Sequence, residues 1–90
     1  TYLTHLRHEP AELLLVSCCD KLHNARAILT DLITHGESFF NRFTGKKEGT
    51  LWYYRELSNI YQERLPNVVA VRELASVVDA IEKLCIGNTH

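Results

Sequence analysis

Methionine is absent from this 90-residue sequence, and glycine, proline and cysteine are scarce, at four, two and three residues. A chain that begins at Thr1 and holds no methionine does not look like an unprocessed translation product, so we expect a piece of a longer protein. So few glycines and prolines argue against a disordered or loop-dominated chain. The sequence therefore predicts a folded, helix-rich segment, which at this length is one domain or part of one.

The sequence also lacks an excess of charge of either sign and a long apolar run. Ten basic and 11 acidic residues give a formal net charge of -1, so there is no basic field to hold nucleic acid. No apolar run reaches the roughly 20 residues of a membrane span, and the start lacks the order of a signal peptide. The adjacent Cys18 and Cys19 lie in an apolar run and are typical of small buried hydrophobes rather than of a disulfide framework. We expect a cytoplasmic protein with no nucleic-acid or membrane partner.

The apolar residues repeat at helical spacing, and no alternating pattern predicts a sheet. One long helix is expected to follow Pro10 and to end at His35, before Gly36. Residues 13–19 are apolar on nearly every face, which predicts that this helix is the enclosed, central helix of a bundle. Residues 1–8 are typical of the end of an earlier helix. The fold class is all-α.

The second half predicts three further segments. A short helix is expected from Glu37 to Phe43, followed by a polar loop over residues 44–49. Thr50 is the expected N-cap of the next helix, which Pro66 ends. Residues 68–85 then form the most regular amphipathic helix of the chain, with apolar residues at threes and fours.

One polar stripe crosses the long helix, where Asn24 lies about 40° from Asp20 on a helical wheel. A carboxylate in an enclosed helix requires a hydrogen bond, an ion pair or a metal, and Lys21 and Arg26 are expected to point elsewhere. Two interpretations remain open from the spacing alone. Asp20 and Asn24 either bond to a neighbouring helix or form part of a ligand site.

The segment 15–26, Leu-Val-Ser-Cys-Cys-Asp-Lys-Leu-His-Asn-Ala-Arg, resembles the last motif of the HD superfamily of metal-dependent phosphohydrolases. It is most similar to the guanosine tetraphosphate hydrolases of the RelA/SpoT kind, with an apolar run, Asp, Lys or Arg, Leu, any residue and Asn. Residues 46–55 resemble the matching region of small stand-alone HD proteins. The resemblance implies that residues 1–90 are a single, partial domain, the C-terminal part of an HD-type helical bundle.

The resemblance also implies a chemistry, the hydrolysis of a nucleotide phosphate or pyrophosphate, with the 3′-pyrophosphate of guanosine tetraphosphate as one candidate. In this family a His, a His-Asp pair and a final Asp hold a divalent metal, and Asp20 would be that last ligand. Manganese is the expected metal, with iron and zinc as alternatives. The metal would orient the substrate and activate a water, and Asn24 would contact ribose or phosphate oxygens.

The other ligands of the family precede the final Asp, and no His-Asp pair occurs among the 19 residues before Asp20. His5 and His8 have helical i, i+3 spacing that suits a chelate, but solvated side chains are the simpler interpretation. No catalytic residue is therefore assigned, and the chain by itself is expected to be inactive.

Four further residues are candidates for substrate binding. Lys46 and Lys47 could hold phosphates, although two lysines in a loop more commonly form a solvated surface. Tyr53 and Tyr54 could stack on a base or line a pocket, although a Trp-Tyr-Tyr run on a helix mostly serves the core, with one member facing out.

The alternative function is a non-catalytic helical interaction or dimerisation module. It is suggested by the apolar stripe of residues 68–85 and by a core that 90 residues do not readily close. Under either interpretation we expect self-association, because uncovered apolar surface must be hidden from water.

Overall fold

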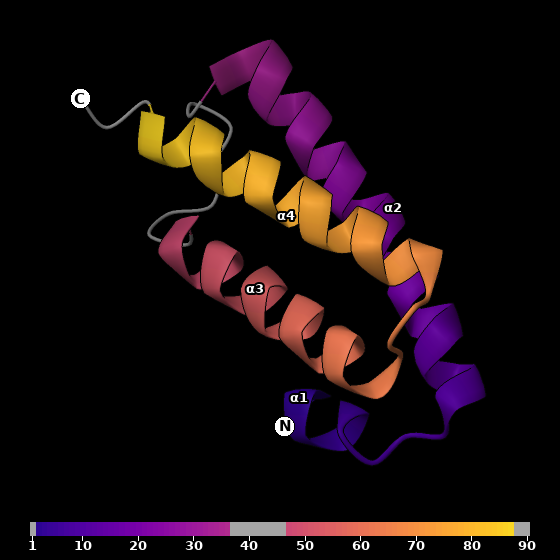
Figure 1. Cartoon of the computed structure of the whole chain (residues 1–90). Coiled ribbons are helices and arrows are strands. Elements are labelled where there is room, and N and C mark those ends of the chain that lie inside the picture. The colour runs from indigo at the N-terminus through magenta and orange to yellow at the C-terminus, as the bar shows by residue number, and fades with distance from the viewer. Residues whose placement is uncertain (1, 37–46, 88–90) are drawn as a thin grey trace.

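A computed structural model describes residues 2–36 and 47–87 of the chain. These residues form the helices α1 (Tyr2–Leu6), α2 (Ala11–His35), α3 (Lys47–Arg64) and α4 (Val69–Gly87), as Figure 1 shows. No strand occurs in either described range. The all-α class is therefore confirmed, as a compact four-helix domain.

The limits of α2 follow from its flanking residues. Pro10 stands at the N-cap with φ -59°, a value its ring imposes and one that leads into a helix. At the other end Gly36 adopts φ 66° and donates its backbone N–H to the carbonyl of Leu32. A positive φ is cheap only for glycine, so the helix stops where the sequence predicts.

α3 begins at Lys47, which makes the prediction of an N-cap at Thr50 wrong by one turn. Glu48 lies in the first turn, where a negative charge is favourable next to the helix dipole, and Gly49 is tolerated there. The expected short helix 37–43 and loop residues 44–46 lie outside the described residues. At its other end α3 stops before Pro66, as predicted.

α4 lies at the centre of the arrangement, packed against α2 on one side and α3 on the other (Figure 1). Most of its apolar stripe is buried between them, namely Val71, Leu74, Val78, Ile81 and Cys85. The amphipathic helix was predicted correctly, and these members of its stripe pack within the chain.

The prediction that α2 is the enclosed, central helix is wrong. One face of α2 is buried, through Leu14, Cys18, Leu22, Ala25 and Leu32. Its opposite side leaves Val16 68% and Leu13 56% exposed. A helix with apolar residues on all sides is buried only where another element covers it. Among the described residues, the other helices cover one side of α2.

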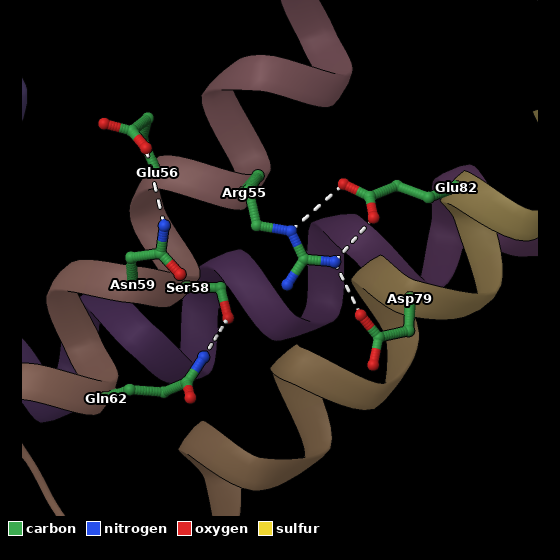
Figure 2. A network of polar contacts seen from close by, with 7 residues as sticks. All are labelled: Arg55, Glu56, Ser58, Asn59, Gln62, Asp79 and Glu82. Carbon is green, nitrogen blue, oxygen red and sulfur yellow. Dashed lines mark hydrogen bonds and ion pairs between the residues drawn. The ribbon is translucent and has the colours of Figure 1, made fainter.

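Polar contacts fix the relative position of the helices. The Arg55 guanidinium on α3 donates to both carboxylate oxygens of Glu82, at 3.1 and 2.6 Å, and to Asp79 at 2.5 Å, both on α4 (Figure 2). Arg64 at the end of α3 donates to the carbonyls of Leu6, Arg7 and Glu9 behind α1. These contacts hold α4 to the middle of α3 and the segment at the end of α1 to the C-terminal end of α3.

Candidate metal and nucleotide site

Asp20 lies on the outer side of α2, with its side chain 65% exposed. The expectation of a buried carboxylate is therefore wrong in this chain. The Lys21 ammonium, expected to point elsewhere, lies 3.8 Å from the Asp20 carboxylate. Water and this loose ion pair solvate the Asp20 carboxylate, so no buried partner is required.

Asn24 is half-buried and lies one turn further along the same side of α2, as its spacing from Asp20 predicts. Asp31, two turns further, is also half-buried. The polar side chains therefore lie on one side of α2, with Asp20 exposed and Asn24 half-buried.

Tyr53 and Tyr54 are both half-buried on α3, with their rings edge to face at 5.7 Å and 87°. Burial raises the pKa of Tyr54, and electrostatic repulsion from an ionised Tyr53 and from Asp20 raises it further. Trp52 is 59% exposed, so one aromatic of the run faces out, as predicted.

A chain of hydroxyl groups lies one turn before Asp20 and was not predicted from the sequence. Ser17 on α2 lies 3.0 Å from the Tyr2 hydroxyl and 2.6 Å from the Tyr61 hydroxyl, which joins α1, α2 and α3. The Lys21 ammonium also stands 5.1 Å from the centre of the Tyr2 ring, a cation–π distance. The sequence feature that could have indicated this contact is Ser17, the one hydroxyl in an otherwise apolar stretch of the helix.

The remaining candidate ligands and substrate-binding residues are not shown near Asp20. Lys46 and the side chain of Lys47 lie outside the described residues. The His5 imidazole lies 2.8 Å from the Glu9 carboxylate, so it has a partner other than a metal. In ranges 2–36 and 47–87 no three His, Cys, Asp or Glu side chains gather as a metal site.

The two adjacent cysteines differ in their surroundings. Cys18 is buried, and burial raises the pKa of its thiol to about 11. It behaves as the small hydrophobe that the sequence predicts. Cys19 is exposed, so the prediction of burial is wrong for this residue.

An open groove lies elsewhere, between α2 and α4, and its lining includes Arg26, Val69 and Arg72. None of the candidate site residues lines it. No helix in the described ranges is long and apolar enough to cross a membrane.

No protein-family model, curated protein or solved structure matches this chain. Any activity is therefore inferred from its own residues and their arrangement.

Proposed function

We propose that this chain is part of an HD-type metal-dependent phosphohydrolase that acts on a nucleotide phosphate or pyrophosphate. Guanosine tetraphosphate is the leading candidate substrate. The observation that supports this most is the segment from Asp20 to Asn24, which resembles the last HD motif and has its carboxylate open to solvent. A solvated carboxylate on an apolar helix contributes nothing to this core and is available to bind a ligand.

Asp20 fits one position of the implied metal site, because a carboxylate oxygen suits manganese, iron and zinc. The fit of the described residues ends there, since they provide no second and third ligand beside Asp20. The His and His-Asp ligands would have to come from outside residues 1–90. When bound, such a metal lowers the pKa of a coordinated water.

The ion pair with Lys21 does not prevent this role. At 3.8 Å and with Asp20 mostly exposed, such a pair is worth about 0–1 kcal/mol. The Lys21 ammonium also has a second partner in the Tyr2 ring. Ligation of Asp20 would therefore cost little rearrangement.

The other proposed roles concern the substrate. Asn24, on the same side of α2, would hydrogen-bond to ribose or phosphate oxygens. Tyr54 and Tyr53, half-buried on α3, would supply aromatic rings for stacking on a base. Lys46 and Lys47, just before and at the start of α3, would supply positive charge for the phosphates.

The test is manganese-dependent hydrolysis of guanosine tetraphosphate by the complete protein that contains residues 1–90. Asp20→Asn should lower kcat/KM by at least about 100-fold, since even partners that only orient metal ligands contribute about 10–100-fold. Asp31→Asn, the same change three turns along α2, is the matched control and should leave the activity unchanged. Asn24→Ala should mainly raise KM.

Unchanged activity in Asp20→Asn, or a parent sequence without a His and a His-Asp pair before Thr1, would contradict the proposal. Residues 1–90 alone should not bind manganese tightly. Tight binding that is lost in Asp20→Ala would contradict the proposal that their ligand set is incomplete.

The second candidate is a non-catalytic helical interaction module. The α4 stripe that suggested it is buried within the chain, so its support now comes from α2. There Leu13 and Val16 are exposed one turn apart on the side of α2 that no described helix covers. A parent protein without the upstream ligands would favour this function.

A further inference from the structure

The outer side of α2 carries a regular exposed stripe. Its positions are spaced alternately by three and four residues, and all are exposed: Leu13, Val16, Asp20, His23, Ala27 and Thr30. We name this set the α2 seam. Its spacing is that of the a and d positions along which helices pair in coiled coils.

The α2 seam points away from the rest of the chain. On a helical wheel its centre lies roughly opposite the buried face formed by Leu14, Cys18 and Ala25. No described helix lies over it, and Val16 and Leu13 are the large apolar residues it exposes. A second helix can therefore approach the seam without displacing the core.

We propose that the α2 seam pairs with the α2 seam of a second copy, antiparallel, to form a symmetric homodimer. The two-fold axis passes between Asp20 and His23. Asp20 then lies opposite His23 of the partner subunit, and the same pair recurs on the other side of the axis. A two-fold interface requires this self-complementarity, and the seam has it.

Charge selects the antiparallel orientation. In a parallel pair each seam residue meets its own copy, so two Asp20 carboxylates would be pressed together in an apolar contact. The antiparallel pair instead brings each carboxylate to an imidazole. Both side chains are exposed in this chain, and Lys21, 3.8 Å from Asp20, is the neighbouring cation.

Side-chain size favours the same arrangement. With the axis between Asp20 and His23, Val16 meets Ala27 of the partner subunit, and Leu13 meets Thr30 of the partner subunit. Each contact joins a larger side chain to a smaller one, which lets two helices approach closely along their length. The proposal does not depend on the hydrolase function, and pairing and metal ligation are alternative uses of Asp20.

The first experiment measures the dimer dissociation constant of the 90-residue chain by sedimentation equilibrium, with EDTA present to exclude metal bridges. Val16→Glu should raise the dissociation constant at least about tenfold, which corresponds to roughly 1.4 kcal/mol. Ile33→Glu is the matched control, because Ile33 is 69% exposed on α2 but lies off the seam. It should leave association unchanged, and circular dichroism should show equal helix content in both variants.

The second experiment tests orientation through charge. His23→Asp and Asp20→His should each weaken association, because each removes one member of the opposed pair. The double variant should restore it, since the exchanged charges still meet across the axis. A chain that stays monomeric up to millimolar concentration would overturn the proposal. So would an Asp20→His variant that associates more tightly, the result expected for parallel pairing, or a double variant that fails to recover.

Discussion

The α3–α4 contact and the outer side of α2 are built in opposite ways. Between α3 and α4, Ser58 is fully buried but bonded to Gln62, and Arg55 is held by two carboxylates (Figure 2). Within the described residues no buried side-chain nitrogen or oxygen lacks a hydrogen bond. On the outer side of α2, Val16 and Asp20 both face water. Asp20 thus lies on the solvent side of α2, outside the buried core.

The largest expected effect contrasts two adjacent leucines of α2. Leu14 is fully buried and Leu13 is 56% exposed. Leu14→Ala should lower the free energy of unfolding by about 2–5 kcal/mol, because it leaves a cavity in the core. Leu13→Ala should change it by at most about 0.5 kcal/mol when measured in dilute, monomeric solution. Urea unfolding followed by circular dichroism measures both, and equal losses would remove the distinction between the two faces.

The next prediction concerns alkaline pH. Burial raises the pKa of Tyr61 well above its ordinary value, although the hydrogen bond to Ser17 opposes the shift. The folded chain therefore binds this proton more tightly than the unfolded chain. Its contribution to stability is complete below the ordinary tyrosine pKa of about 10 and is lost as pH rises above it.

Melting temperature should accordingly fall from about pH 10 upward, in the range where unfolded tyrosines ionise. Tyr61→Phe cannot ionise and should show a shallower fall, at the cost of about 0.5–1.5 kcal/mol at neutral pH for the lost bond to Ser17. Tyr2→Phe, a change to an exposed ring in the same hydroxyl chain, is the control and should keep the wild-type slope. An identical slope in Tyr61→Phe would contradict this account.

A smaller effect is expected at the α3–α4 ion pairs. Arg55→Gln removes contacts to Asp79 and Glu82, which are partly exposed, so the loss should be about 1 kcal/mol. The difference from wild type should shrink in high salt, because salt screens exposed charges. Arg72→Gln, an exposed arginine on α4, provides the control. A salt-independent loss would indicate that packing of the Arg55 stem matters more than its charge.

The least invasive measurement compares two neighbouring cysteines. Iodoacetamide should modify Cys19 in the native chain and leave Cys18 unmodified, because Cys19 is exposed while burial keeps Cys18 protonated. Mass spectrometry of peptides identifies the modified residue, and unfolding in guanidinium should expose both. Equal reactivity of Cys18 and Cys19 in the native chain would mean that the face of α2 that carries Cys18 is also open to water.

Part of the site was visible in the sequence because a helix places residues four apart on one side. The spacing of Asp20 and Asn24 alone predicts that arrangement, and the structure has it. The chain of hydroxyls through Ser17 links residues on three different helices. Spacing along one helix carries no information about such contacts, so they could not be predicted.

The sequence by itself determined the all-α class, the limits of α2 and the end of α3, because periodicity, Pro10, Gly36 and Pro66 act on the chain locally. It did not determine which helix lies at the centre. α2 has more apolar residues on more faces than a surface helix needs, yet α4 is the one enclosed. Burial depends on which elements cover a face, and only the tertiary structure decides that, along with the exposure of Asp20.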